Sequence, residues 1–477
     1  MFFKQFYEPR LAQYSYMIAC PASGEALVVD PLRDFDLYLA EAEAQRVRIT
    51  HVTETHIHAD FLSGAWGLAQ ATGAELLLSD EGGPDWLYAF PHIGLRDGNV
   101  FQVGNVQVEV LHTPGHTPEH LTFLIKDKAA QNEPVMLLTG DFLFVGDVGR
   151  PDLLELAAGV QGTSEPMAKL MYRSLQRIKN LPDHVGLFPG HGAGSACGKA
   201  LGAVPSSTLG YEKRTNWALQ PMDEAAFVAR LLQDQPDPPH YFANMKRWNR
   251  SGEKVHGWLS WPRRLSVQEV ERMADTAFLV DTREKRAFAG GHIPGSINIQ
   301  NIRLFTTWAG WLLDYEKPII LVASESDIFE LVRALYRIGL DLVVGFFPDV
   351  EYWRRTGHPL VELKQITVEA LDRALQSAED ILIVDVRGSV EYIGGHIPGA
   401  ISLPGGRLPE RMSDLPKTKP LVMYCGSGDR SCIAASLLQR EGFENVLNLA
   451  DGFQAWNRSG YPVEKGRQQA LVSESYA

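Results

Sequence analysis

Side chains that bind metal ions gather in the first half of the sequence, at the ends of strand-like runs. Three of them occupy alternate positions just after residues 48–53, so an extended chain points them the same way. The others stand beside glycines, which let the backbone turn sharply. One such histidine is usually structural, but four ordered motifs of this kind predict a metal site. The candidates are His56, His58, Asp60, His116, Asp141 and His191.

One cysteine near the C-terminus has the surroundings of a sulfur nucleophile. Cys425 follows the apolar run 421–424 and precedes a helix predicted to begin near Ser431. A glycine-rich turn at a helix N-terminus supplies N–H donors that favour a thiolate and an anionic persulfide. Arg430 adds charge for a sulfite-like or thiosulfate-like anion, and its Cys-x4-Arg spacing is one residue shorter than a phosphatase requires. Besides catalytic Cys425 and Arg430, the predicted sulfur-binding loop contains Gly426, Ser427, Gly428, Asp429 and Ser431.

Short strands and flanking helices must position the metal-binding side chains. In the first 250 residues, the alternation of strands and helices predicts two sheets covered on the outside by helices, an αββα sandwich. The rest of the chain has the pattern of α/β modules. The predicted fold class is therefore multidomain, α/β and α+β. The apolar runs predict strands over 14–20, 26–30, 48–53, 106–111, 121–126 and 135–138, and helices near 34–45, 62–72 and 164–179.

The rest of the chain contains one module twice. Residues 280–283 return at 384–387, and residues 291–295 return at 395–399. Each copy alternates short apolar strands with helices, which predicts two α/β modules with parallel sheets. The first copy has Ala323 where the second has its cysteine, so we expect it to be inactive. The predicted domains are 1–250, 265–360 and 366–465.

Composition narrows the classes of function. The formal net charge of −13 disfavours nucleic acid as a partner, and no apolar run is long enough to predict a membrane span. The four cysteines are too few for a disulfide framework, and the N-terminus has no pattern of an export signal. We therefore expect a cytoplasmic protein, with the oligomeric state, homodimer or homotetramer, left open.

The metal-binding motifs resemble those of the metallo-β-lactamase superfamily, and most closely the persulfide dioxygenases within it. The resemblance implies one Fe(II) per chain, held by His56, His116 and Asp141. Phe61 stands where dinuclear hydrolases of the superfamily carry a histidine, which weakens a two-metal site. The resemblance makes His58, Asp60 and His191 residues that orient ligands or contact substrate.

Three further features carry alternatives. Arg150, followed by Asp152, resembles a family element and has either a structural ion pair or a substrate-side role. Cys197 is either a small buried residue or a persulfide relay, with Lys199 nearby to favour its thiolate. The segment 242–247 matches the family region near which a thiol carrier is held.

The last module resembles rhodanese, with Cys425 as the residue that carries sulfur. Together the resemblances imply a fusion protein with two reactions. The first oxidises a low-molecular-weight persulfide, such as glutathione persulfide, with O2 to sulfite. The second transfers sulfur between persulfide, sulfite and thiosulfate. The first alternative is a glyoxalase II-like enzyme in which zinc-activated water hydrolyses a thioester. The second is a sulfane-sulfur carrier without net catalysis.

Overall fold

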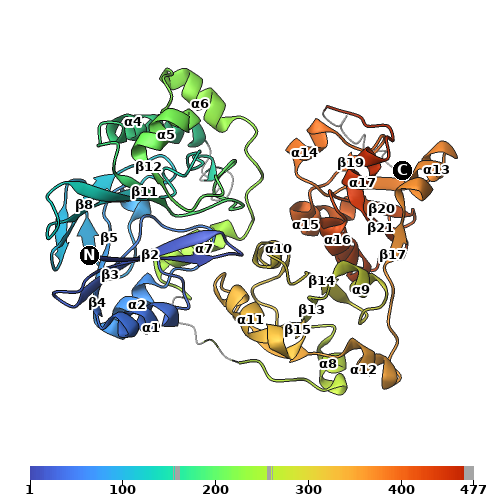
Figure 1. Ribbon diagram of the computed structural model, residues 1–477. Coiled ribbons are helices and arrows are strands. Elements are labelled where there is room, and N and C mark those ends of the chain that lie inside the picture. The colour runs from blue at the N-terminus through green and yellow to red at the C-terminus, as the bar shows by residue number, and fades with distance from the viewer. Residues whose placement is uncertain (154, 156–161, 255–258, 260, 467–477) are drawn as a thin grey trace. The chain divides into compact units, whose positions relative to one another are not determined.

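The computed structural model describes residues 1–153, 155, 162–254, 259 and 261–466. The chain divides into two compact units, Met1–Leu259 with Arg333–Asp341, and Ser260–Val332 with Leu342–Ala477 (Figure 1). Among the described residues, no helix combines the length and the apolar composition that a membrane crossing needs.

Two six-stranded sheets build the described part of the first unit. Their orders are β1-β2-β3-β4-β5-β6 and β12-β11-β10-β9-β8-β7, with parallel and antiparallel pairs in both. The strands of the first sheet are β1 (Phe2–Glu8), β2 (Gln13–Cys20), β3 (Glu25–Val29), β4 (Arg48–Thr53), β5 (Glu75–Ser79) and β6 (Ile93–Leu95). Those of the second are β7 (Val100–Val103), β8 (Val106–His112), β9 (Leu121–Asp127), β10 (Pro134–Gly140), β11 (Gly186–Pro189) and β12 (Ser207–Thr208).

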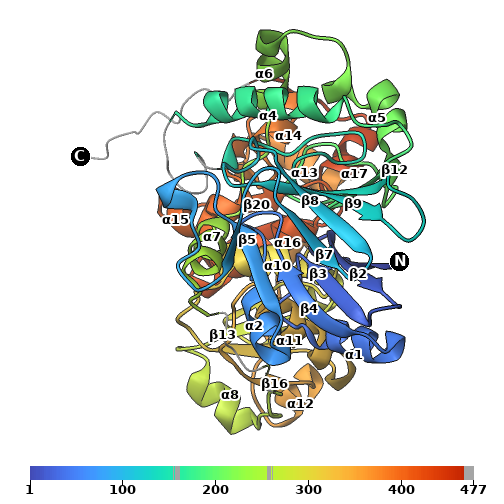
Figure 2. The same cartoon turned by 90° about the vertical axis from the view of Figure 1, so that its left-hand side faces the viewer.

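Helices cover the outer faces of both sheets, with α1 and α2 on the first and α4 on the second, where α6 packs against α4 (Figure 2). This confirms the predicted αββα sandwich. The helices are α1 (Asp36–Gln45), α2 (Ala65–Thr72), α4 (Ser164–Ile178), α5 (Leu209–Thr215), α6 (Glu224–Leu232) and α7 (Phe242–Ser251).

Strand β2 shows how the sequence fixes these layers. Successive side chains of a strand point to opposite faces. Tyr16 and Ile18 pack in the core between the two sheets, whereas Met17 and Ala19 pack in the core beneath α1 and α2. All four are buried, so the strand reads as a continuous apolar run.

The second unit contains two smaller sheets whose pairs are all parallel in the described residues, as predicted. Their orders are β14-β13-β15-β16 and β17-β21-β20-β18-β19. The strands are β13 (Phe278–Asp281), β14 (Ser296–Asn298), β15 (Ile319–Val322), β16 (Val343–Phe347), β17 (Lys364–Ile366), β18 (Leu382–Asp385), β19 (Ile401–Ser402), β20 (Leu421–Tyr424) and β21 (Val446–Leu449).

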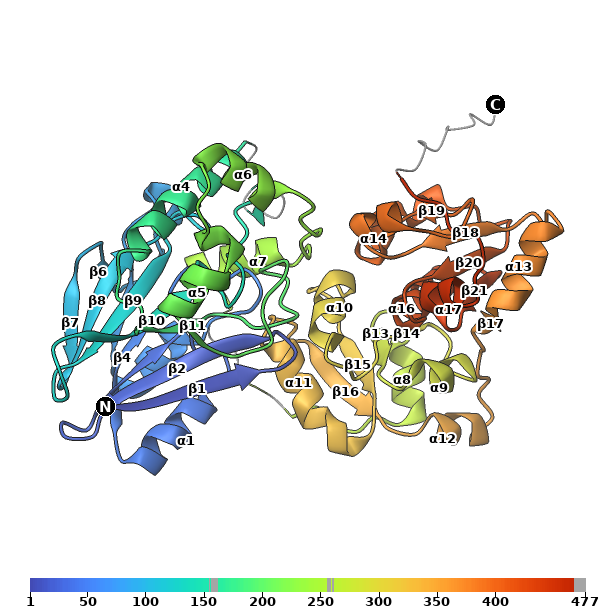
Figure 3. The same ribbon diagram turned by 45° about the horizontal axis from the view of Figure 1, so that its top comes forward.

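Helix α16 packs against strands of both small sheets, namely β14, β20 and β21 (Figure 3). The helices near the first sheet in sequence are α8 (Val267–Met273), α9 (Lys285–Ala289), α10 (Phe305–Leu312), α11 (Ile328–Tyr336) and α12 (Val350–Arg355). Those of the second copy are α13 (Val368–Gln376), α14 (Ser389–Gly394), α15 (Leu408–Arg411), α16 (Asp429–Arg440) and α17 (Gly452–Arg458).

The repeated sequence motif has a structural role in both modules. Arg387 pairs with Asp385 through two nitrogens and donates to the carbonyl of Gly395 at 2.7 Å. Arg283 makes the same contacts with Asp281 and with the backbone of the first module. This arginine therefore ties a strand end to the glycine turn, and the motif alone does not report catalysis.

Candidate functional site

Three buried side chains of the first unit converge from different strands. His56 follows β4, His116 follows β8 and Asp141 directly follows β10. Their potential ligand atoms lie within 4.8 Å of one another. Nε2 of His56 lies 3.9 Å and Nε2 of His116 lies 3.6 Å from Oδ2 of Asp141. That oxygen has no hydrogen-bond partner among the described residues, as expected of an atom aimed at a metal ion.

Hydrogen bonds fix the imidazoles with Nε2 free for a metal. Nδ1 of His116 donates to the Arg150 carbonyl at 3.0 Å, so its Nε2 carries the lone pair. Nδ1 of His56 lies 3.0 Å from Oγ1 of Thr55. Burial holds the pKa of both His56 and His116 well below the usual value. Both rings are therefore neutral, which is the form that binds metal.

His191 bridges two carboxylates beside this cluster. Its Nδ1 donates to Asp141 at 2.6 Å and its Nε2 donates to Asp60 at 2.8 Å. Burial opposes a charge on His191, but Asp141 and Asp60 raise its pKa well above the usual value. Gly190 allows this approach, because a Cβ there would lie 2.6 Å from Oδ1 of Asp141. His191 and Asp60 thus lie beside Asp141, and their predicted role in orienting a metal ligand or contacting substrate stays a prediction.

His58 turns away from the ligand atoms toward Asp30. Its Nε2 lies 3.0 Å from Oδ1 of Asp30, which also accepts from the Thr55 backbone. Burial by itself would lower the pKa of His58, but the Asp30 carboxylate outweighs it and the pKa is raised to about 9. Asp30 was not among the predicted site residues, since it ends a strand without any motif of its own.

The ligand loop is held by residues far away in the sequence. Asn249 on α7 donates to the carbonyls of His58 at 2.8 Å and Phe61 at 2.7 Å. Its Oδ1 accepts from the backbone of Ser63 at 2.9 Å. Glu119 accepts from the Ile57 backbone, between the two histidines of the motif. Neither Asn249 nor Glu119 stands in a metal-binding pattern, so neither could be predicted from the sequence.

Lys246 also lies on α7, one turn before Asn249. It is only 8% exposed, and its Nζ lies 4.5 Å from the centre of the Trp86 ring. That nitrogen has no hydrogen-bond partner within the described part of the chain. Burial lowers the pKa of Lys246 to about 8. After burial, the charge of Lys246 is the largest cause that lowers the pKa of His116, so the ammonium group lies near the cluster.

The surroundings of Phe61 and Arg150 can be compared with the roles predicted for these two residues. Phe61 is fully buried and its ring lies 4.4 Å from that of His58, so this position offers no metal ligand. Arg150 donates to Asp152 at 2.9 and 2.6 Å and also to the carbonyl of Pro236. The ion pair of Arg150 with Asp152 is therefore present, and a substrate-side role of Arg150 stays a prediction.

Cys197 lies beside the cluster but not in the surroundings that were expected. Asp60, His191 and Cys197 offer ligand atoms within 4.8 Å of one another. Lys199, however, donates to the Gln233 carbonyl at 2.8 Å. Burial, and to a lesser extent the carboxylates of Asp60 and Asp141, raise the pKa of Cys197 well above the usual value. The predicted activation by Lys199 is therefore wrong, because burial and negative charge favour the neutral thiol. A relay by Cys197 stays a prediction.

In the last module, the predicted loop closes around Cys425. This residue directly follows β20 and is fully buried. Its Sγ accepts from the backbone N–H of Gly428 at 3.2 Å and from the hydroxyl of Ser431 at 3.5 Å. Gly428 has φ of +90°, and a Cβ there would lie 2.0 Å from the Ala450 carbonyl, so only glycine fits the turn.

Helix α16 begins at Asp429, slightly before the start predicted near Ser431. Arg430 therefore lies in the first turn of this helix. Its guanidinium makes two bonds to Glu391, at 2.6 and 2.8 Å. Although burial opposes its charge, the Glu391 carboxylate raises the pKa of Arg430. Arg430 is thus held beside the loop as a fixed cation.

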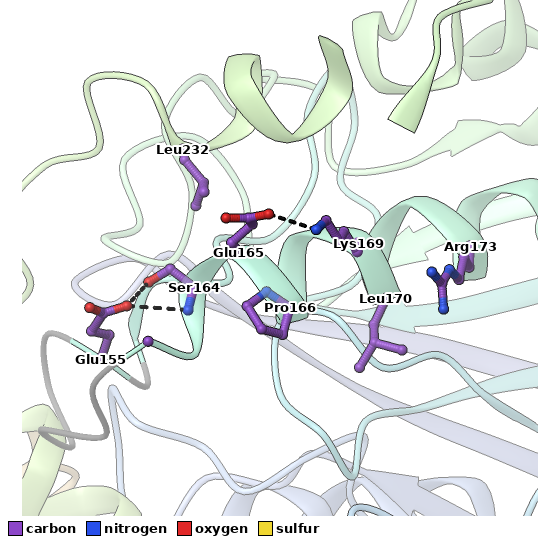
Figure 4. Close-up of a pocket in the computed structure, with 9 residues that line it drawn as sticks. Glu155, Ser164, Glu165, Pro166, Lys169, Leu170, Arg173 and Leu232 are labelled. Atoms are coloured by element: carbon purple, nitrogen blue, oxygen red, sulfur yellow. Dashed lines mark hydrogen bonds and ion pairs between the residues drawn. The ribbon is translucent and has the colours of Figure 1, made fainter. Parts of the chain in front are cut away.

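A surface cavity of about 700 Å³ lies elsewhere in the first unit, at the start of α4 (Figure 4). Its charged groups pair with one another or with neighbours: Lys169 with Glu165, and Glu155 with Ser164. No histidine or cysteine is among the described residues that line it. The described lining of this cavity therefore offers none of the imidazole and thiol groups that the two buried sites contain.

The fold and these two sites define the class of protein. The metallo-beta-lactamase superfamily model matches residues 9–191, and the rhodanese-like domain model matches residues 266–346 and 367–459. The chain belongs to the metallo-β-lactamase superfamily and carries two rhodanese-like domains after that fold.

Particular relatives match different parts of the chain. A solved metallo-beta-lactamase from Staphylococcus aureus subsp. aureus COL is 42% identical with a TM-score of 0.66, covering 73% of this chain and 99% of that one. A sulfurtransferase of Allochromatium vinosum is 43% identical over 101 residues, 21% of this chain and 94% of the relative. The persulfide dioxygenase ETHE1 of Bos taurus is 30% identical over 198 residues, 39% of this chain and 67% of the relative.

Hydroxyacylglutathione hydrolases are also among the relatives, at 31% and 34% identity. The chain spans about half the length of the beta-lactamase hydrolase-like proteins of Xylella fastidiosa that it matches, 56% in each.

Proposed function

We propose that the chain is an enzyme of sulfur metabolism with two reactions. The first unit oxidises a low-molecular-weight persulfide, such as glutathione persulfide, and the last module transfers sulfur between persulfide, sulfite and thiosulfate. The observation that carries the proposal is the buried set of His56, His116 and Asp141 in one chain with the loop around Cys425. A persulfide dioxygenase and a sulfurtransferase among the relatives support the two parts of the proposal.

The donor set of the first unit fits one Fe(II). Two imidazoles and one carboxylate are the donors of non-haem Fe(II) oxygenases, and Asp141 has the orphaned oxygen that such a site needs. When bound, Fe(II) supplies open coordination positions for O2 and the persulfide sulfur. The balanced reaction is RSSH + O2 + H2O giving RSH, sulfite and two protons.

The residues around the cluster prepare this chemistry. The Arg150 carbonyl and His191 orient the histidine and aspartate ligands. Phe61 closes the position of a second-metal ligand with an apolar ring. Lys246, whose Nζ has no hydrogen-bond partner among the described residues, brings a positive charge close to the cluster, where it can attract the anionic sulfur of the substrate.

At the second site, Cys425 carries sulfur covalently. Its thiolate attacks the outer sulfur of thiosulfate, so a sulfur–sulfur bond to Cys425 forms while the bond to the sulfonate sulfur breaks. The electron pair leaves with sulfite. The N–H of Gly428 and the hydroxyl of Ser431 donate to the reacting sulfur and stabilise its negative charge.

A zinc thioester hydrolase is the second candidate, and the hydroxyacylglutathione hydrolases among the relatives favour it. Metal analysis of anaerobically purified protein, paired with O2 uptake on glutathione persulfide, separates the two. We expect one iron per chain and O2 uptake with sulfite release. Zinc content, no O2 uptake and hydrolysis of S-lactoylglutathione would overturn the proposal. Without steady-state release of sulfite or thiosulfate, the chain would be a sulfur carrier.

A further inference from the structure

The inactive module reaches the sulfur-binding loop of its neighbour within the second unit. Lys285, the first residue of α9, donates from Nζ to the Ser427 carbonyl at 2.6 Å. The same nitrogen lies 3.0 Å from Oδ1 of Asp429. Gln300 accepts from the Lys285 backbone at 3.0 Å and donates to Asp429 at 3.3 Å. The Lys285 side chain is 16% exposed, so this contact is largely shielded from water.

The contact with Ser427 bears directly on the nucleophile. The carbonyl of Ser427 and the N–H of Gly428 belong to one planar trans peptide, in which the two groups point in opposite directions. Lys285 holds the oxygen on one side, and on the other side the N–H donates to Sγ of Cys425 at 3.2 Å. A cation on the carbonyl also polarises the peptide and strengthens the N–H as a donor.

We propose that Lys285 is a positioning residue for Cys425, acting through the peptide between Ser427 and Gly428. By holding the Ser427 carbonyl, Lys285 aims the N–H of Gly428 at the sulfur and stabilises the anionic thiolate and persulfide. The module with Ala323 in place of a nucleophile thus supplies part of the active site of the other module. This inference rests on the proposed sulfur transfer at Cys425.

A docking role alone is the competing explanation, and the chain contains a matched control for it. Arg286 is the next residue of α9 and lies 3.7 Å from Asp451 of the last module. Its side chain is 78% exposed, and its ion pair is with Asp451 rather than with Ser427 or Asp429. Removing Arg286 takes away an equal charge and a contact between the same two modules, but leaves the peptide at Ser427 held.

The test compares full-length Lys285→Met, Lys285→Arg, Arg286→Met and Cys425→Ser with the unchanged protein. Transfer of sulfur from thiosulfate to cyanide gives kcat and KM, and mass spectrometry follows the alkylation rate of Cys425. We expect Lys285→Met to lower kcat and the alkylation rate about tenfold, with KM for thiosulfate changed by less than about twofold. Lys285→Arg should recover most of the rate, and Arg286→Met should match the unchanged protein.

Equal rates in Lys285→Met and the unchanged protein, or equal losses in Lys285→Met and Arg286→Met, would overturn the positioning role. Sulfur transfer that persists in Cys425→Ser would instead overturn the proposed function, so the two failures are distinct. If Lys285→Met does not fold, Lys285→Gln is measured by the same criteria.

Discussion

His191 determines where one carboxylate oxygen lies. Its two nitrogens link Asp141 to Asp60, so Oδ1 of Asp141 is engaged and Oδ2 alone faces the two imidazoles. Replacing His191 with asparagine should lower metal affinity and persulfide oxidation about 10- to 100-fold, because the aspartate then loses its orienting partner. Metal titration and O2 uptake measure the two effects.

His184→Asn is the control for this prediction, since His184 is half-exposed and contacts the Pro134 carbonyl instead. If the His191→Asn variant binds as much metal as the unchanged protein, the orienting role of His191 is contradicted.

The pair of His58 and Asp30 predicts a pH dependence in the metal-free protein. The pKa of His58 is raised to about 9 in the folded protein. The positive charge of His58 therefore stabilises the fold fully at any pH below the pKa that His58 has in the unfolded chain. This stabilisation is about 3 kcal/mol at most. It is lost as the pH rises through the pKa of His58 in the folded protein. Urea unfolding of chelator-treated protein and of His58→Gln should therefore show a difference in stability that shrinks from about pH 6 to about pH 10. A constant difference would contradict the ion pair.

At the level of elements, strand ends were readable from the sequence and distant supports were not. The positions of His56, His116 and Asp141 after strands follow from apolar runs broken by glycine turns, which are local signals. Asn249 and Lys285 act across 188 and 142 positions of sequence, on Phe61 and Ser427. Such contacts depend on how elements pack together, and one sequence contains no local pattern for them.

Helix α7 provides a prediction at this level. Asn249 satisfies two carbonyls and one N–H of the ligand loop, all in a buried place. Truncating it to alanine leaves these groups unpaired and should destabilise the first unit by about 2–4 kcal/mol, with weaker metal binding. Asn244→Ala is the matched control, because Asn244 lies on the same helix but is only half-buried. Thermal unfolding with and without metal checks the prediction, which fails if the two variants unfold alike.

For the whole molecule, the sequence predicts an oxidising site and a sulfur-transfer site in one chain, but not the hydrogen bond from Lys285 of the first module to the sulfur-binding loop of the second. In the proposed function, sulfite links the two reactions, because it is the product of one and the acceptor in the other. In that scheme, Cys425 takes sulfur from a second persulfide, releases the thiol of that persulfide, and passes the sulfur to sulfite to form thiosulfate. The product of the whole chain should therefore depend on Cys425 while O2 uptake does not.

Cys425→Ser should consume O2 with glutathione persulfide at the rate of the unchanged protein, yet release sulfite in place of thiosulfate. His116→Ala should consume none. Mixing these two variants restores thiosulfate only after sulfite has diffused between molecules, so thiosulfate should appear with a lag that lengthens on dilution. The unchanged protein keeps both sites in one chain and gains effective concentration, which shortens the lag and removes its dependence on protein concentration. Chromatography of the sulfur anions over time distinguishes the cases, and identical time courses for the mixture and the unchanged protein would show that the fusion gives no kinetic coupling.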